Sequence, residues 1–266
     1  MSDNNTQHYQ YCDVEQRGHV LIVTIRRSEV RNALHRPACL ELEKIFDRFE
    51  ADPSSWVAVI TGEGDKAFCA GNDLKFQAAG NDNTWPPSGF GGITGRVNLQ
   101  KPVIAAVNGV ALGGGFEIAL ACDLIIASED AEFALPEPRV GLAAICGGLL
   151  RLSQQIAYKE AMGIILTSRR VKASEGKSLG FVNEVVAKDQ VLATALRWAE
   201  EILKASPLAI RASKALVQAG LSEPAMSETY PRQKQLPAVA ALYASADRIE
   251  GPRAFAEKRS PVWSGR

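Results

Sequence analysis

The sequence lacks net charge, paired cysteines and any long uninterrupted apolar run. Its thirty basic and thirty acidic residues cancel, so no overall field attracts nucleic acid or an anionic membrane surface. The five cysteines are odd in number and none forms a C-x-x-C pair, which argues against a disulfide framework and against a zinc site. This cysteine usage is typical of a reducing compartment. We therefore expect a cytoplasmic protein that holds no metal and binds neither nucleic acid nor a membrane.

The signatures of several catalytic classes are also missing. All three histidines lie within the first 35 residues, away from the glycine-rich motifs. There is no G-x-S-x-G elbow, which argues against a serine–histidine hydrolase, and no Walker loop, which argues against that type of nucleotide site. Cys69 stands beside a glycine turn, where a small buried cysteine is favoured over a nucleophile.

At 266 residues the chain is long enough for one large α/β domain. The polar residues 1–10 lack the apolar run of a signal peptide and are expected to form a loose leader. The longest apolar stretch, residues 103–127, contains Asn108, Glu117, Asp123 and three consecutive glycines, and ionised groups are costly in hydrocarbon. We predict a buried strand–helix–strand there instead of a membrane span.

Apolar segments rich in branched residues alternate with segments of helical spacing. The pattern predicts a helix over 37–50 and strands at 20–25, 56–61, 102–107 and 123–127. Because the strands are almost continuously apolar, they indicate parallel pairing covered on both faces, which is an α/β fold. Helical signals dominate from residue 172. We predict an α/β core over residues 1–200 and a C-terminal helical domain over residues 201–266.

Glycine and proline prevent regular structure over residues 80–95. We interpret most of this segment as a mobile surface loop. The alternative is a lid in which Trp85 or Phe90 contacts a substrate, since loops carry function disproportionately. The same two rings could form an aromatic cage for a cation.

The segment Ala111–Glu117 places three glycines at the start of an apolar helix. Such a start leaves backbone N–H groups unpaired, and the helix dipole adds about half a positive charge. An oxyanion or a phosphate would fit there. For an isolated glycine triplet, tight packing of helix against sheet is the simpler explanation, and Glu117 alone would be a first-turn glutamate stabilised by the dipole.

Glu137 lies between Pro136 and Pro138, which fix their φ angles and hold the chain rigid. A rigid carboxylate suits catalysis because its geometry is set before a substrate arrives. Taken alone, it would be a capping or turn glutamate. Its occurrence together with Glu117 and the glycine turns predicts an acid and a base that handle water beside a developing enolate.

Several motifs occur in a recognisable order along the chain. They are Ala67–Leu74, Lys101–Gly109, Gly113–Glu117 and Asp123–Ala127, with further similarity over Ala161–Val186 and Glu250–Arg259. This order resembles the enoyl-CoA hydratase/isomerase (crotonase) superfamily, and the resemblance runs from about Val20 to the end. Within the superfamily, residues 89–94, 133–137 and 249–266 are most similar to the carnitinyl-CoA dehydratase branch.

The resemblance implies a crotonase-like spiral of ββα units with a C-terminal helical trimerisation domain, and a homotrimer or a dimer of trimers. The residue pattern alone leaves a doubly wound sheet open. An oxyanion hole would use the backbone N–H groups of Asn72 and Gly114, which bind a thioester carbonyl as it becomes an enolate. Glu117 would be the base that activates water and Glu137 the acid that protonates the α-carbon, with the roles reversed in dehydration.

The implied reaction is the reversible addition of water to a 2-enoyl-CoA, with coenzyme A as part of the substrate and no separate cofactor. Family isomerases often need only one acidic residue, whereas both are glutamate here. An enoyl-CoA isomerase or a carbon–carbon lyase on the same scaffold is the alternative, and an RNA-binding relative is disfavoured by the zero net charge. The residues that would hold coenzyme A are Asn72, Asp73, Leu74 and Lys75 through backbone, with Phe255 and Lys258 at the adenine and 3′-phosphate. For Lys258, a solvated surface charge is an equal alternative.

Two departures from the family pattern concern specificity. The segment Gly141–Gly148 lacks the usual Gly-x-x-Pro and also the proline and aspartate of the carnitinyl type. Asn72 stands where simple hydratases tend to have alanine and the carnitinyl type has tryptophan, so its side chain would reshape the acyl pocket. The acyl group therefore stays open.

Overall fold

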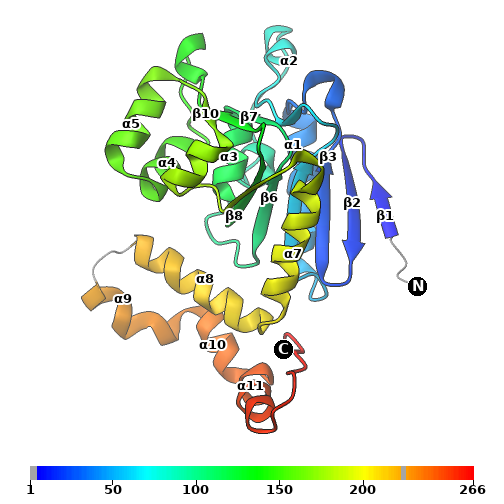
Figure 1. The fold of residues 1–266 in the computed structure, drawn as a ribbon, viewed down its shortest axis with the longest axis vertical. Coiled ribbons are helices and arrows are strands. Elements are labelled where there is room, and N and C mark those ends of the chain that lie inside the picture. Colours follow the sequence, from blue (N-terminus) through cyan, green and yellow to red (C-terminus); the bar gives the residue numbers. More distant parts are fainter. Residues whose placement is uncertain (1–4, 223–225) are drawn as a thin grey trace. The chain divides into compact units, whose positions relative to one another are not determined.

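The computed structural model describes residues 5–222 and 226–266, and it divides into two compact units. One unit is formed by residues up to Val97 together with Val103–Ala199, and the other by Asn98–Pro102 and Glu200–Arg266. The described strands all belong to the first unit, whereas the second is helical (Figure 1).

A seven-stranded sheet forms the frame of the first unit. Its strand order is β1-β2-β3-β4-β6-β8-β11, and all neighbours from β3 to β11 pair in parallel. The predicted strands are confirmed as β3, β4, β6 and β8, and their apolar runs are buried because both faces of the sheet are covered. The bounds are β1 Asn5–His8, β2 Cys12–Arg17, β3 Val20–Ile25, β4 Val57–Gly62, β6 Val103–Val107, β8 Leu124–Ser128 and β11 Glu184–Val186.

The expectation of a loose leader over residues 1–10 is wrong for Asn5–His8. These residues form β1, which pairs with β2 in antiparallel register at the edge of the sheet. An edge strand offers unpaired backbone donors and acceptors whatever the side chains are. A polar segment can therefore add a strand without the apolar pattern from which strands are predicted.

A smaller four-stranded sheet carries the turns that matter for function. Its order is β10-β9-β7-β5, with β9, β7 and β5 parallel to one another. Successive pairs of strands have the same arrangement: the longer strand of each pair joins the first sheet and the shorter strand joins the second. The pairs are β4 and β5, β6 and β7, and β8 and β9. The predicted spiral of ββα units is therefore confirmed. The bounds are β5 Ala67–Cys69, β7 Val110–Leu112, β9 Glu132–Ala134 and β10 Val171–Lys172.

Helices follow these strand pairs and cover the sheets. The predicted helix over 37–50 is confirmed as α1. Apart from Glu117, helix α3 is apolar on all sides, and it is buried from Gly114 to Leu120, so it belongs to the core. The bounds in the first unit are α1 Arg36–Ala51, α2 Leu74–Ala78, α3 Gly114–Ala121, α4 Gly148–Gln155, α5 Tyr158–Thr167 and α6 Ala173–Leu179, and α7 Val191–Leu203 leads into the second unit.

The interpretation of residues 80–95 as a mobile surface loop is wrong for its second half. Residues 80–82 are exposed, but Phe90 is only 1% exposed and starts a short turn that runs to Gly92. A Cβ added at Gly91 would lie 2.5 Å from the Ile118 side chain. The glycines therefore allow the chain to press against α3, where a residue with a side chain would not fit.

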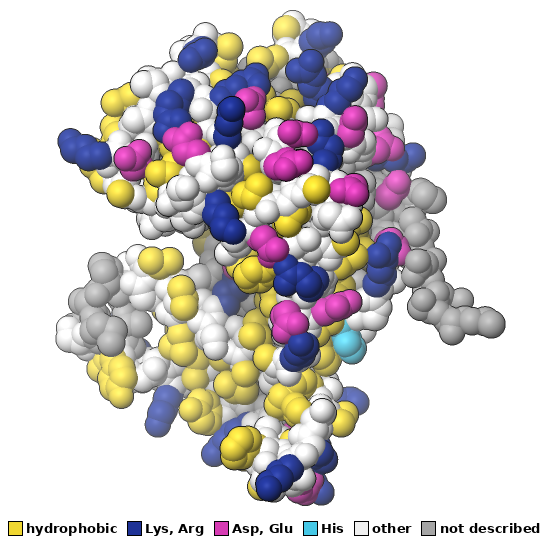
Figure 2. Space-filling model, viewed as in Figure 1, with side chains coloured by type: hydrophobic (Ala, Val, Ile, Leu, Met, Phe, Trp, Pro, Cys, Tyr) yellow, Lys and Arg dark blue, Asp and Glu magenta, His cyan; other side chains and the backbone are white. Residues whose placement is uncertain are grey.

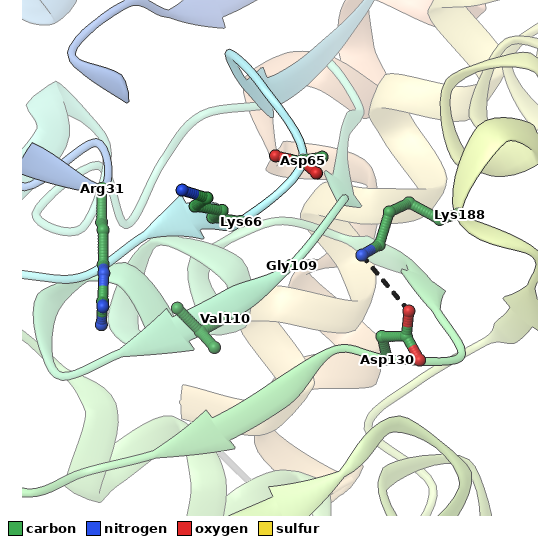
Figure 3. Close-up of a pocket in the computed structure, with 7 residues that line it drawn as sticks. All are labelled: Arg31, Asp65, Lys66, Gly109, Val110, Asp130 and Lys188. Carbon is green, nitrogen blue, oxygen red and sulfur yellow. Dashed lines mark ion pairs between the residues drawn. The ribbon is translucent and has the colours of Figure 1, made fainter. Parts of the chain in front are cut away.

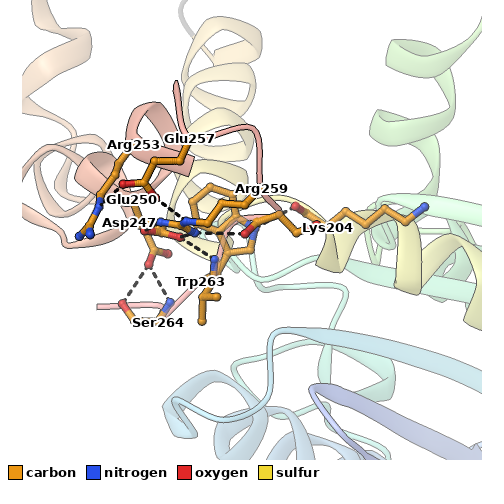
Figure 4. Close-up of polar contacts among 10 residues, drawn as sticks. Lys204, Asp247, Glu250, Arg253, Glu257, Arg259, Trp263 and Ser264 are labelled. Carbon is orange, nitrogen blue, oxygen red and sulfur yellow. Dashed lines mark hydrogen bonds and ion pairs between the residues drawn. The ribbon is translucent and has the colours of Figure 1, made fainter. Parts of the chain in front are cut away.

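The second unit consists of helices and a C-terminal tail that is tied back to them. Asp247 accepts hydrogen bonds from the Ser206 hydroxyl at 2.8 Å and from the Ser264 N–H at 2.8 Å, and the Trp263 indole donates to the Lys204 carbonyl at 2.8 Å (Figure 4). Arg259, which follows α11, folds back to pair with Glu250 in the first turn of the same helix. The bounds are α8 Pro207–Ser222, α9 Met226–Arg232, α10 Pro237–Ala244 and α11 Asp247–Ala256.

Charge is mixed over the face of the first unit that Figure 2 shows. Figure 2 shows acidic and basic side chains interspersed over the visible face of the first unit, without a large patch of one sign. Among the residues that the structure describes, no helix is both long enough and apolar enough to cross a bilayer.

Candidate active site

The residues singled out in the sequence converge at one edge of the small sheet. Asn72 follows β5, Gly114 follows β7, and Glu137 follows β9. Because these three strands are parallel neighbours, their carboxyl ends meet at the same edge, which is where α/β proteins bind ligands. The order of the spiral thus brings together segments that are far apart in the chain.

The two glycine turns are in direct contact. Gly71 has a φ of 92°, and a Cβ added there would lie 2.6 Å from the Leu112 carbonyl and 3.2 Å from the Gly114 nitrogen. The backbone carbonyl of Gly71 is already paired, because it accepts a 2.8 Å hydrogen bond from the Leu34 N–H. No hydrogen bond between described residues uses the N–H of Asn72 or of Gly114. Two backbone donors at the contacting turns are therefore left unpaired within the described part of the chain.

Glu117 lies in the first turn of α3 and is buried, with 3% of its surface exposed. Its carboxylate accepts a 2.9 Å hydrogen bond from the N–H of Gly148, which is the first residue of α4. A Cβ added at Gly148 would lie 2.8 Å from the Glu117 Cγ, so glycine is required for this approach. The carboxylate is thus held between the N-termini of two helices.

Burial raises the pKa of Glu117 to about 7. The Gly148 N–H opposes this increase because it stabilises the charged form, while the negative charge of Glu137 adds to it. A carboxyl group whose pKa lies near neutrality can both take up and release a proton at physiological pH. The environment of Glu117 therefore suits general acid–base chemistry.

Glu137 begins the 3-10 turn η3, Glu137–Val140, between its two prolines. A Cβ added at Gly113 would lie 2.7 Å from Glu137 Oε1, so this carboxyl group borders the glycine turn. Its Oε2 atom is buried and has no hydrogen-bond partner among the described residues. Burial also raises the pKa of Glu137. A buried polar atom without a partner is rare in folded proteins and points to a ligand or a catalytic role.

Phe90 forms a wall of the site. A Cβ added at Gly114 would lie 2.4 Å from the Phe90 ring, so the ring lies directly against the second glycine turn. Trp85 meets Phe90 edge to face, with ring centroids 4.9 Å apart. Phe90 is packed in the core, with only 1% of its surface exposed. The predicted aromatic cage stays a prediction.

Cys146 brings a thiol to the two carboxyl groups. Burial and the negative charge of Glu117 raise its pKa to about 12, and the Phe90 N–H acts in the opposite direction. Burial likewise raises the pKa of Cys69 to about 12. Both thiols are therefore protonated at neutral pH, which disfavours either as a nucleophile. The prediction that Cys69 is a small buried cysteine is confirmed.

The residues predicted to hold coenzyme A lie in different settings. Asp73 caps α2 by accepting the Phe76 N–H at 3.1 Å, and it forms a 3.0 Å ion pair with Arg27, so its side chain is occupied. Leu74 and Lys75 are exposed on α2. Phe255 is 87% exposed on α11, and Lys258 follows that helix in the second unit. Their contacts with coenzyme A stay predictions.

A separate basic pocket of about 260 Å³ opens on the first unit. Lys188 pairs with Asp130 at 3.2 Å on one side of it, while Arg31 and Lys66 stand across from this pair (Figure 3). Neither catalytic candidate lines the pocket. Its lining residues are Arg31, Asp65, Lys66, Gly109, Val110, Asp130 and Lys188.

A comparison with known protein families identifies the chain. The family model for enoyl-CoA hydratase/isomerase matches residues 15–266. The chain belongs to this family. The resemblance seen in the ordered motifs is confirmed.

Individual relatives agree with this membership. The chain is 42% identical to the carnitinyl-CoA dehydratase of Proteus mirabilis (strain HI4320), over 97% of this chain and 99% of the relative. A solved enoyl-CoA hydratase from Mycobacterium tuberculosis H37Rv is 38% identical to this chain, with a TM-score of 0.91. The match covers 97% of this chain and 100% of the hydratase chain. The carnitinyl-CoA hydratase of Mycobacterium avium is 41% identical, with a TM-score of 0.75 over the same shares.

Some neighbours of the site in this family member were not predicted. The Gly148 N–H that binds Glu117 had a visible signal, because Gly147 and Gly148 stand at the start of α4 as Gly113 and Gly114 stand at the start of α3. No local pattern predicted that the Cys146 thiol would lie near enough to Glu117 and Glu137 for their charges to raise its pKa. These contacts depend on how distant segments pack, which local patterns do not encode.

Proposed function

We propose that this chain is an enoyl-CoA hydratase/dehydratase that adds water reversibly to the double bond of a 2-enoyl-CoA thioester. One observation carries the proposal: the buried Glu117 and the half-buried Glu137, both with a raised pKa, lie beside two contacting glycine turns, and the N–H groups of Asn72 and Gly114 have no partner among the described residues. Family membership and relatives named carnitinyl-CoA dehydratase or enoyl-CoA hydratase support it.

In the proposed mechanism the thioester oxygen accepts hydrogen bonds from the N–H groups of Asn72 and Gly114. Glu117 removes a proton from water while the water oxygen bonds to the β-carbon, and the electron pair of the double bond moves toward the thioester as an enolate. Glu137 then gives its proton to the α-carbon. The two N–H donors stabilise the negative charge as it develops on oxygen. Dehydration follows the same steps in reverse.

Only proton transfers and backbone donors take part in this scheme. We therefore propose that no metal or redox cofactor is needed and that coenzyme A enters as part of the substrate. The backbone from Asn72 to Lys75 would hold the pantetheine side of the coenzyme. In our proposal, Phe255 and Lys258 meet the adenine and the 3′-phosphate.

The test is a panel of 2-enoyl-CoA thioesters, with water addition detected by mass spectrometry. Crotonobetainyl-CoA belongs in the panel because of the similarity to carnitinyl-CoA dehydratases. We expect a mass increase of one water on at least one thioester. Migration of the double bond or cleavage of a carbon–carbon bond, without hydration, would favour an isomerase or a lyase on the same scaffold.

We further propose that the basic pocket receives a phosphate group of coenzyme A. The Arg31 carbonyl accepts the Ala70 N–H at 3.0 Å, and Ala70 directly precedes the glycine turn at Gly71. The pocket is therefore adjacent to the segment that would hold the coenzyme. Arg31 and Lys66 supply positive charge opposite the Lys188–Asp130 pair.

Replacing Arg31 or Lys66 with alanine should raise KM for the acyl-CoA about fivefold at low salt and leave kcat unchanged. The reason is the loss of about 1 kcal/mol of attraction between a solvated cation and a phosphate. Steady-state kinetics at two salt concentrations measures this, since salt should shrink the difference. Lys204→Ala removes an exposed cation of the second unit and is the control. If KM at low salt is unchanged in both Arg31→Ala and Lys66→Ala, the basic pocket does not bind a phosphate group of coenzyme A.

For the assembled protein we propose a homotrimer or a dimer of trimers in the cytoplasm. All five cysteines are free thiols, as expected in a reducing compartment. Several large apolar side chains of the first unit are exposed and would be covered on assembly. They are Val140, Leu142, Ile145, Leu150 and Leu166. Light scattering coupled to size-exclusion chromatography gives the mass directly.

A further inference from the structure

Arg151 connects the two segments that enclose the site. It lies in the first turn of α4, and its Nη2 donates a 2.7 Å hydrogen bond to the carbonyl of Thr94. Its Nη1 lies 3.5 Å from the carbonyl of Cys146. A Cβ added at Gly147 would come within 2.1 Å of this nitrogen, so the guanidinium folds back directly over the Gly147 turn.

Each of the connected segments contributes a group to the site. Thr94 follows the turn that carries Phe90, whose ring lies against Gly114. The Gly147 turn leads into the Gly148 N–H, which binds Glu117. A displacement of the guanidinium would therefore disturb the wall beside the oxyanion donor and the hydrogen bond to the base.

The charge of Arg151 has no carboxylate partner in direct contact. No ion pair between described residues involves Arg151, and the hydrogen bonds found for its side chain go to backbone carbonyls. The groups that face Glu117 are the Glu137 carboxyl, the Cys146 thiol and this guanidinium. Of these, only Arg151 carries a positive charge, and it favours the ionised form of Glu117.

We propose that Arg151 is a positioning residue of the proposed hydration reaction, because it braces the Thr94 and Cys146 carbonyls and fixes the turn that donates to Glu117. Its positive charge also keeps Glu117 ready to accept a proton from water. This inference deepens the proposed function, on which its consequence for catalysis rests. The brace and its effect on Glu117 can be measured without catalysis.

The experiment follows the Glu117 carboxyl carbon by ¹³C NMR during a pH titration of the full-length protein, with Glu117→Gln used to assign the signal. Arg151→Met removes the charge and the brace, and Arg151→Gln removes the charge but keeps one donor. We expect each to raise the pKa of Glu117, because an opposite charge is lost. Arg151→Lys keeps a positive charge and should give a smaller shift.

Arg96→Met is the matched control. Arg96 lies two residues after Thr94 and its side chain is only 12% exposed, but it pairs with Asp47 and Glu50. The pKa of Glu117 should not change in this variant. In kinetics, the acidic limb of kcat/KM for hydration should move to higher pH in Arg151→Met and Arg151→Gln, since a larger fraction of Glu117 is then protonated at a given pH.

The outcomes separate the two proposals. An unchanged pKa of Glu117 in folded Arg151→Met or Arg151→Gln overturns the role of Arg151, even if kcat falls through loss of structure. If no 2-enoyl-CoA is hydrated by the wild-type protein, the proposed function fails, while the NMR titration still decides whether Arg151 sets the state of Glu117.

Discussion

Glu137→Gln should lower kcat for hydration by about two to four orders of magnitude, the usual contribution of a positioned general acid. Glutamine has almost the same shape but cannot give a proton to the α-carbon. Binding of the acyl-CoA should change little, because the oxyanion donors and the basic pocket are untouched. The loss of enoyl absorbance measures kcat, and calorimetry with a saturated acyl-CoA measures binding.

Glu117→Gln should cause a similar loss of hydration for a different reason, since water is no longer activated. The two roles can be separated with butyryl-CoA in D₂O, a substrate that has no leaving group. Exchange of its α-proton needs only Glu137 and the oxyanion donors, so Glu117→Gln should retain the exchange and Glu137→Gln should lose it. The exposed Glu129, changed to glutamine, is the control and should affect neither reaction.

Two results would contradict these roles. Turnover of every active substrate by Glu137→Gln at the wild-type rate would exclude Glu137 as the acid. Loss of α-proton exchange in folded Glu117→Gln, with exchange retained in Glu137→Gln, would reverse the assignment.

The fold was predictable where a strand or helix has a long, regular pattern of apolar side chains. The buried strands β3, β4, β6 and β8 are long apolar runs, which is why the sequence located them. The strands β5, β7 and β9 have three residues each and adjoin glycine motifs, so they carry too little pattern to be recognised. The spiral depends on these short strands, and it was therefore predicted only through the family resemblance.

The candidate site likewise has features that the sequence predicts locally and features that depend on tertiary packing. The glycine triplet and Glu117 are neighbours in sequence, and the helix start between them is a local signal. The raised pKa of Glu117 comes from burial and from Glu137, and its hydrogen bond comes from Gly148, all of which are tertiary effects. The side chain of Asp73 caps α2 and pairs with the distant Arg27, and that pairing is likewise a tertiary contact; the prediction that the Asp73 backbone holds coenzyme A stays a prediction.

Gly114→Ala should lower kcat/KM by about two to three orders of magnitude, the typical effect of losing one oxyanion donor. The N–H itself remains, and Gly114 has no positive φ that would exclude alanine. The new Cβ would, however, lie 2.4–2.7 Å from three atoms of the Phe90 ring. Because that ring is buried and packed against Trp85, the backbone at residue 114 must move, and its N–H leaves the position required by the substrate oxygen.

A second substitution tests this steric explanation. Phe90→Leu removes the ring atoms that meet the new Cβ. The double variant Gly114→Ala/Phe90→Leu should therefore be more active than Gly114→Ala. Phe90→Leu alone should be no more active than the wild-type protein. Gly163→Ala is the matched control, since Gly163 lies within α5 and an added Cβ there meets nothing within 4 Å. If Gly114→Ala keeps wild-type kcat/KM, the N–H of residue 114 does not stabilise the enolate. If the double variant is no better than Gly114→Ala, the loss does not come from contact with Phe90.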